Sequence, residues 1–117
     1  MRRTALIAIL PLLLFGIGDA MAHAFLDHAS PLVGSTVANA PSEVTLWFTQ
    51  SLEAKFSSIT VTNASGQRVD SGSSGVSGNV MRVSLRASGP GTYRVTWRVL
   101  SVDTHTTQGS FTFRVGK

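Results

Sequence analysis

Alternation of apolar and polar side chains constrains the fold of this chain more than any other feature of its sequence. The stretch TYRVTWRVL, residues 92–100, places large apolar residues in one phase and arginine or threonine in the other. EVTLWFT (43–49) and SFTFRV (110–115) repeat the pattern. A period of two is typical of a strand with one buried face. We therefore predict half-buried strands, with Tyr93 and Trp97 packed in the core.

Further apolar runs at residues 56–62 and 80–85 predict two more strands, and residues 24–29 suit a first one. Turn residues such as Gly, Pro, Asn and Ser separate these runs. We expect the Ser/Gly-rich stretch 71–79 to be a flexible loop between strands. About seven short strands favour an all-β fold, an antiparallel Greek-key β-sandwich. A small closed barrel is the alternative.

The beginning of the chain has the pattern of a secretory signal peptide. Basic residues at 2–3 precede a mostly apolar stretch at 5–18, and the small-residue box AMA follows at 20–22. An uncleaved anchor is the weaker interpretation, because a membrane span needs roughly 20 apolar residues. We expect cleavage after residues 1–22, which leaves residues 23–117 as one small exported domain.

Composition excludes some classes of function. The chain has no cysteine, so disulfides and thiolate metal sites are ruled out. The formal net charge of the whole chain is +4, but within residues 23–117 the basic residues are scattered singly, without a basic run or an aromatic-interleaved patch. We therefore expect no nucleic-acid partner. No nucleophile stands in a recognisable catalytic motif, and we do not expect an enzyme.

Cleavage after Ala22 would make His23 the first residue of the exported chain. Its α-amine and its imidazole Nδ1 could then chelate one metal ion. Ordinary pKa values of about 8 for the amine and about 6.5 for the imidazole make loss of both protons inexpensive at neutral pH.

A second pair of candidate ligands lies in SVDTH, after the strongest predicted strand. Asp103 and His105 are two residues apart, so they would share a face if the strand continues, with Cα atoms roughly 6.5 Å apart. With His23 they offer three nitrogens and one oxygen. This ligand set favours one Cu(II) ion per chain, and zinc would accept it with lower affinity. The site forms only if the amino terminus folds back beside residues 103–105.

The segments HAFLDHASPLVGSTV, APSEVTLWFTQSL and GTYRVTWRVLSVDTHTTQGSFTFRV resemble the CopC family of periplasmic copper-binding proteins. The resemblance implies a cupredoxin-like β-sandwich or barrel. It also implies a copper site built from His23, Asp103 and His105. The function it implies is sequestering or carrying Cu(II) in copper homeostasis or resistance. We expect a monomer that passes copper to an inner-membrane transporter of the CopD type.

Several positions depart from the family pattern. Some relatives hold Cu(I) in a methionine-rich loop, whereas this chain keeps only Met81 after cleavage, so we expect no Cu(I) site. Gln50 stands where relatives carry an acidic residue near the site, which puts that outer role in doubt. Thr106 replaces a common proline, a change of minor expected effect. We expect His28 to be a surface or structural histidine rather than a ligand.

Two other functions remain open. An N-terminal histidine chelate is also used by copper monooxygenases that cleave polysaccharides, but Asp103 would help to fill the equatorial plane that oxygen needs. A metal-free interaction module that uses an edge of the sandwich is the third possibility.

Overall fold

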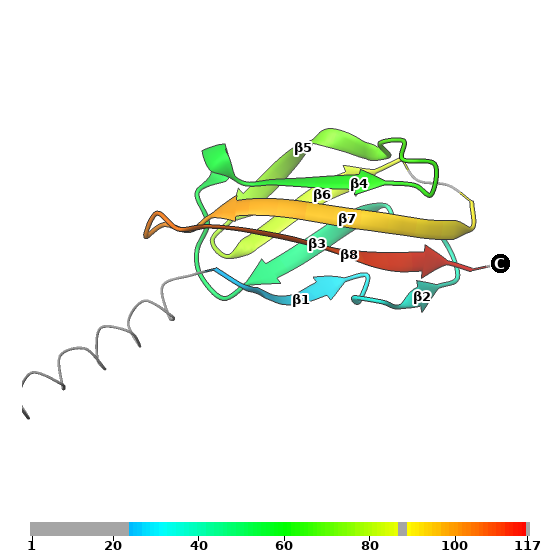
Figure 1. Cartoon of the computed structure of the whole chain (residues 1–117), viewed down its shortest axis with the longest axis horizontal. Helices are drawn as coiled ribbons and strands as arrows, with labels where there is room; N and C mark the ends of the chain where they lie inside the picture. The colour runs from blue at the N-terminus through cyan, green and yellow to red at the C-terminus, as the bar shows by residue number, and fades with distance from the viewer. Residues whose placement is uncertain (1–23, 87–88, 117) are drawn as a thin grey trace, which may run out of the picture.

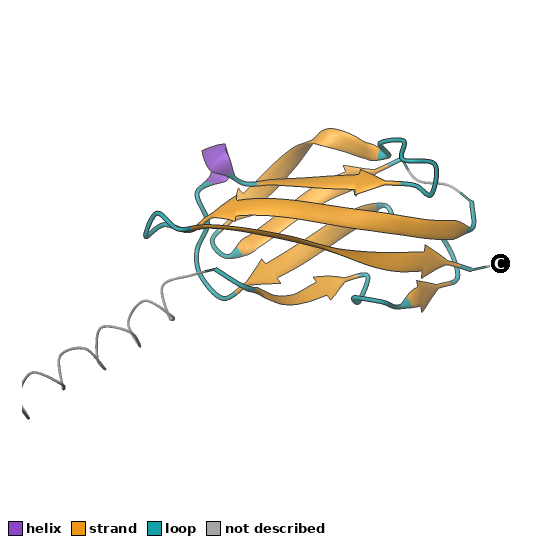
Figure 2. Cartoon of the chain, viewed as in Figure 1, coloured by secondary structure: helices purple, strands orange, loops and turns teal. Residues whose placement is uncertain are grey.

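The computed structural model describes residues 24–86 and 89–116, and these form two packed four-stranded sheets (Figures 1 and 2). One sheet has the order β1-β3-β6-β5 and the other β2-β8-β7-β4. All pairings are antiparallel except that of β2 with β8. The strands are β1 (Leu26–Ser30), β2 (Thr36–Val37), β3 (Glu43–Phe48), β4 (Ser58–Thr62), β5 (Asp70–Ser77), β6 (Val80–Leu85), β7 (Gly91–Leu100) and β8 (Thr106–Val115). The predicted sandwich is confirmed.

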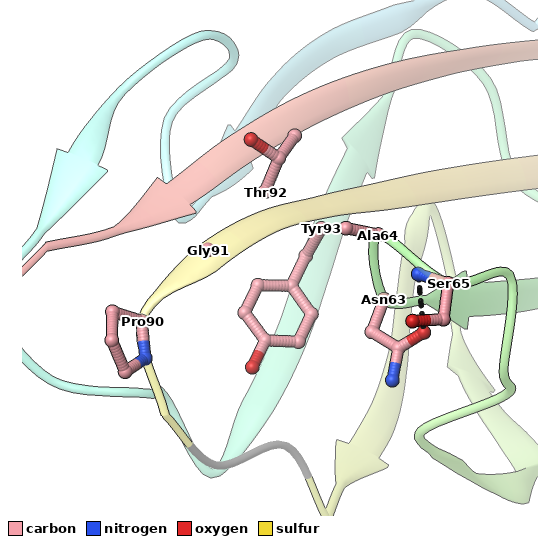
Figure 3. Close-up of a pocket in the computed structure, with 7 residues that line it drawn as sticks. All are labelled: Asn63, Ala64, Ser65, Pro90, Gly91, Thr92 and Tyr93. Carbon is pink, nitrogen blue, oxygen red and sulfur yellow. Dashed lines mark hydrogen bonds between the residues drawn. The ribbon is translucent and has the colours of Figure 1, made fainter.

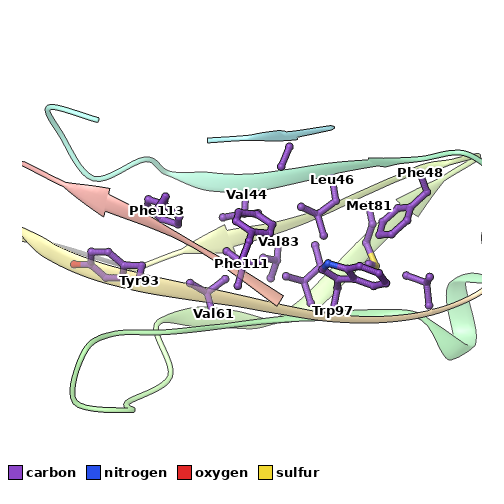
Figure 4. Packing of buried hydrophobic residues seen from close by; sticks show 14 of the residues in the cluster. Val44, Leu46, Phe48, Val61, Met81, Val83, Tyr93, Trp97, Phe111 and Phe113 are labelled. Carbon is purple, nitrogen blue, oxygen red and sulfur yellow. The ribbon is translucent and has the colours of Figure 1, made fainter. Parts of the chain in front are cut away.

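The predicted alternation governs the longest strands. In β7 every second side chain from Tyr93 to Val99 is buried, while Arg94, Thr96 and Arg98 are exposed. The inward side chains of both sheets form one core (Figure 4). Trp97 packs edge to face on Phe48, with ring centroids 5.1 Å apart, and is buried as predicted.

Gly109 lies opposite Trp97 in the β7–β8 ladder and makes room for the indole ring. A Cβ atom at Gly109 would come within 2.6 Å of that ring. The glycine is therefore a packing requirement at this position.

The loop prediction for residues 71–79 is wrong. Most of this stretch belongs to β5, which pairs with β6 from Ser77 opposite Val80 to Asp70 opposite Leu85. The Ser/Gly side chains of this stretch give it a low intrinsic strand preference. The strand is stabilised instead by backbone pairing with β6. A register shift between Asp70 and Ser74 falls where Gly72 adopts a φ of 91°, a conformation that glycine reaches without strain.

Side chains of β5 also satisfy the edge of β4 in the opposite sheet. Ser74 Oγ accepts the N–H of Ile59 at 2.9 Å, and Asp70 Oδ2 accepts that of Val61 at 2.7 Å. These bonds join the two sheets and blunt an edge that would otherwise present open backbone donors.

Asp70 is the centre of this junction. Its buried carboxylate also accepts the N–H of Gly72 at 2.8 Å and the Nε of Arg68 at 3.0 Å. Burial raises the pKa of Asp70, but the hydrogen bonds from Arg68, Val61 and Gly72 outweigh burial and hold the pKa below its ordinary value.

The signal-peptide prediction falls on residues 1–22, outside the described residues. Within the part of the chain that the structure covers, the only helix is the short 3₁₀ helix η1 (Ala54–Phe56), and no helix has the length and apolar character needed to cross a membrane.

We predict that Asp70→Asn lowers the free energy of unfolding at pH 7 by about 2–4 kcal/mol, because an amide nitrogen would face a backbone donor or Arg68. The pKa of Asp70 is lowered on folding, so its stabilisation is present above the unfolded value of about 3.9 and is lost as pH falls through the folded value. Urea unfolding at pH 7 and pH 3 measures both effects. Glu43→Gln, at an exposed carboxyl, is the control. Equal stability of the Asp70 variant and the parent at pH 7 would contradict this role.

Candidate metal centre

Asp103 and His105 lie at the turn that joins β7 to β8. The N–H of Ser101 donates to the carbonyl of His105 and the N–H of Thr104 donates to that of Ser101, both at 2.9 Å. Residues 102–104 thus form a three-residue hairpin loop, in which Thr104 takes a left-handed φ of 74°.

The sequence-based expectation that Asp103 and His105 converge is confirmed, but by a different geometry. Asp103 is in the loop rather than on a continuing strand, and His105 is one residue before β8. The tight turn brings Oδ1 of Asp103 to 3.5 Å from Nδ1 of His105. The side chains of Asp103 and His105 are about 39% and 42% exposed, but the Nδ1 atom of His105 is itself buried.

Ser101 contacts both Asp103 and His105 and holds them in position. It is fully buried, its hydroxyl donates to Asp103 Oδ1, and its Oγ accepts the N–H of His105 at 3.3 Å. The Ser101 hydroxyl is the main cause that lowers the pKa of Asp103, and His105 adds to the effect. Asp103 is therefore an anionic donor at neutral pH.

The first described residues lie beside this turn. Ala24 is fully buried, and its carbonyl accepts the hydroxyl of Thr107 at 2.6 Å. Phe25 and Thr49 form two hydrogen bonds of 2.9 Å. The N–H of Phe25 donates to the hydroxyl of Thr49, and the N–H of Thr49 donates to the carbonyl of Phe25. The required approach of the amino-terminal segment to the 103–105 turn is thus present as far as Ala24, whereas His23 lies outside the described residues.

A third segment, residues 49–53, completes this end of the sandwich. The N–H of Val102 donates to the carbonyl of Ser51 at 3.0 Å, and that of Glu53 donates to the carbonyl of Leu100 at 2.8 Å. Gln50 is half-buried in this segment, one residue before Ser51. The three segments meet at the end of the molecule drawn on the left in Figure 1.

Sequence reasoning missed Ser101 and Thr107, although both had a recognisable signal. Ser101 continues the inward phase of Val95, Trp97 and Val99, and Thr107 continues that of Phe111 on β8. A hydroxyl in a phase of otherwise apolar residues indicates a polar group that must find a partner inside the fold.

His28 lies apart, on β1. Its ring stacks on Trp47 with centroids 4.3 Å apart, and its Nδ1 is 2.8 Å from Oδ2 of Asp27. It is the surface histidine that we expected. Met81 is fully buried in the core. Among the described residues no cluster of three or more His, Asp or Glu side chains could hold a metal ion, so the Asp103–His105 pair needs a donor from elsewhere.

A small cavity lies at the other end of β7, far from this pair along the strand (Figure 3). Tyr93 borders it and donates its hydroxyl to the carbonyl of Gly89 at 3.0 Å. No carboxylate or imidazole lines this cavity, whose residues are Asn63, Ala64, Ser65, Pro90, Gly91, Thr92 and Tyr93.

The fold and the turn define a β-sandwich protein with a carboxylate–imidazole pair at one end. The sequence model of the CopC domain family matches residues 26–116, so the chain belongs to the CopC family.

Relatives with copper in their names cover most of the chain. Copper resistance protein C of Escherichia coli is 37% identical over 107 residues, 83% of this chain and 84% of that protein. Copper transport protein CutJ of Bacillus subtilis (strain 168) is 32% identical over 115 residues, which are 95% of this chain. This chain spans only 21% of the length of CutJ.

Solved structures agree with the fold. CopC from Methylosinus trichosporium OB3b is 32% identical, with a TM-score of 0.70 over 80% of this chain and 93% of that one. PcoC, a methionine-rich copper resistance protein from Escherichia coli, is 34% identical, with a TM-score of 0.70 over 81% of this chain and 100% of that one.

We predict that Ser101→Ala raises the pKa of Asp103 towards its ordinary value, because the hydroxyl that stabilises the carboxylate is removed. The carboxyl carbon shift of Asp103, followed by NMR across acid pH, measures the change. Ser58→Ala, at an exposed serine on β4, is the matched control. An Asp103 titration that does not move in Ser101→Ala would rule out this contribution.

Proposed function

We propose that this protein is an exported copper carrier that binds one Cu(II) ion through His23, Asp103 and His105. The observation that carries the proposal is the hydrogen bond from Thr107 to the carbonyl of Ala24. This bond holds Ala24, the first described residue, against Thr107, which is two residues after His105. The relatives of this chain in the CopC family include proteins named for copper transport and copper resistance.

Covalent geometry supports a role for His23. One peptide unit, about 3.8 Å between Cα atoms, separates it from the anchored Ala24. After signal-peptide removal, its amine and imidazole supply two nitrogens. Oδ1 of Asp103 and Nδ1 of His105, 3.5 Å apart, are close enough for both to lie about 2 Å from one ion.

The donor set favours Cu(II) over Cu(I). Nitrogen and carboxylate donors suit the divalent ion, whereas Cu(I) selects soft thioethers. The thioether of Met81 is fully buried between the sheets, so it could reach a surface ion only by disrupting the core. This distinguishes the chain from a methionine-rich relative such as PcoC.

Carriage fits these ligands better than catalysis. The anionic Asp103 would occupy a position that a copper monooxygenase keeps open for oxygen, so we propose a carrier and not an enzyme. Its setting would be the periplasm, reached by cleavage of residues 1–22. There it would work as a monomer and deliver copper to a CopD-like transporter in the inner membrane.

We predict that one alanine added ahead of His23 weakens Cu(II) binding by at least a hundredfold, because the chelate of amine and imidazole is lost. His105→Ala should also weaken it, by about 10–100-fold or more for loss of one ligand. Competition titration against a chelator of known affinity gives both values, and electron paramagnetic resonance reports the loss of a nitrogen donor.

His28→Ala is the matched control and should leave the affinity unchanged. Intact mass of the exported protein, with and without Cu(II), checks the processing site and the stoichiometry. If the added alanine leaves the Cu(II) affinity unchanged, the amine of His23 is not a ligand. A mature chain that begins at a residue other than His23 would refute the proposal.

A further inference from the structure

The outward face of the sheet β2-β8-β7-β4 has an unusual composition. Arg98 lies opposite Ser58 on β4 and Gln108 on β8, and Arg94 lies opposite Thr62 and Thr112. Between these rows the outward residues are again hydroxyls. The outward side chains of β4, β7 and β8 are Ser58, Thr60, Thr62, Thr92, Arg94, Thr96, Arg98, Leu100, Thr106, Gln108, Ser110, Thr112 and Arg114. Every charged residue among them is an arginine.

Neutral hydroxyls position two of these guanidinium groups. Nη1 of Arg94 donates to Ser110 Oγ at 3.1 Å, and Nη1 of Arg114 donates to Thr92 Oγ1 at 2.9 Å. Across the described residues, no carboxylate forms an ion pair with the three arginines. Arg68 differs, because Asp70 neutralises it. The face therefore carries three positive charges, two of which are held in position by hydroxyl groups.

The charges are spread over the face. Arg94 and Arg98 are four residues apart on one strand, roughly 13 Å, and Arg114 lies one strand over and beyond Arg94. Arg94 borders a shallow hollow on each side. One of about 500 Å³ also takes in Thr62 and Thr112, and one of about 410 Å³ takes in Arg98.

We propose that this guanidinium–hydroxyl face docks the protein on the surface of an anionic phospholipid bilayer. Guanidinium and hydroxyl groups together donate hydrogen bonds to phosphate oxygens. A bilayer presents phosphates over a broad plane, which matches three arginines spread across one sheet. Attraction of basic side chains to anionic lipids needs no apolar contact.

An acidic protein partner fits this face less well, because stable protein interfaces have an apolar core. The large apolar side chains that are exposed in the described residues all lie elsewhere, at Phe25, Leu32, Val33, Phe56 and Val102. Docking through the sheet face would also lay β7 and β8 along the bilayer. The turn with Asp103 and His105, at the end of these strands, would remain uncovered.

The test is co-sedimentation of the protein, purified after export, with vesicles of phosphatidylglycerol or of phosphatidylcholine. We expect binding to the anionic vesicles only, reversed by 0.5 M salt because the charges are exposed. Each Arg→Gln change at positions 94, 98 and 114 should weaken binding about fivefold, and the triple variant about a hundredfold.

Arg82→Gln, on the outward face of the other sheet, is the charge-matched control and should bind as the parent does. Thermal melting verifies that the variants fold. Equal vesicle binding by the triple variant and the Arg82 variant would overturn the proposal. Binding to polyglutamate without binding to anionic vesicles would overturn it in favour of an acidic polypeptide. Competition by millimolar inorganic phosphate would overturn it in favour of a site for a single anion.

Discussion

The pairing of β7 with β8 is the constraint on which the rest of the molecule depends. Its ladder is unbroken from Gly91 opposite Val115 to Leu100 opposite Thr106, the longest in the structure. Because side chains alternate along a strand, this one hairpin supplies seven of the 17 buried apolar residues in the described core from its inner face and the arginine–hydroxyl array on its outer face. Its closing turn holds the candidate metal ligands.

The turn between β7 and β8 determines how Asp103 and His105 are placed relative to each other. A three-residue loop needs a left-handed residue before the second strand, and Thr104 fills that place although a β-branched side chain is strained there. Ten consecutive pairs of the hairpin hold the conformation, so strain of about 1–3 kcal/mol can persist. As a result the carboxylate of Asp103 turns back onto Ser101 and towards His105 instead of extending into solvent.

Sequence reasoning succeeded where a single strand contains all the information. The alternation in residues 92–100 and 110–115 identified β7, β8 and their buried faces. It failed for β5, whose Ser/Gly side chains carry no period, because that strand exists through pairing with β6 and through contacts of Asp70 and Ser74 with β4. Such contacts join segments distant in the chain and leave no local pattern.

The candidate site shows the same division. Asp103 and His105 could be paired from their spacing, but the turn that joins them and the support of Ser101 required the fold. The role of His23 stays a prediction, since the described residues begin at Ala24.

The position of Ala24 bears on how the site and the fold depend on each other. The segment that follows it enters β1, which pairs with β3 in one sheet, whereas Asp103 and His105 come from the hairpin of the other sheet. The bond between Thr107 and Ala24 therefore crosses from one sheet to the other at this end, as Asp70 does through Val61 at the far edge. An ion held by donors from both segments would add a further link between the sheets. Since a ligand that binds only the folded state stabilises it, copper carriage and stability of the sandwich would be coupled in this molecule.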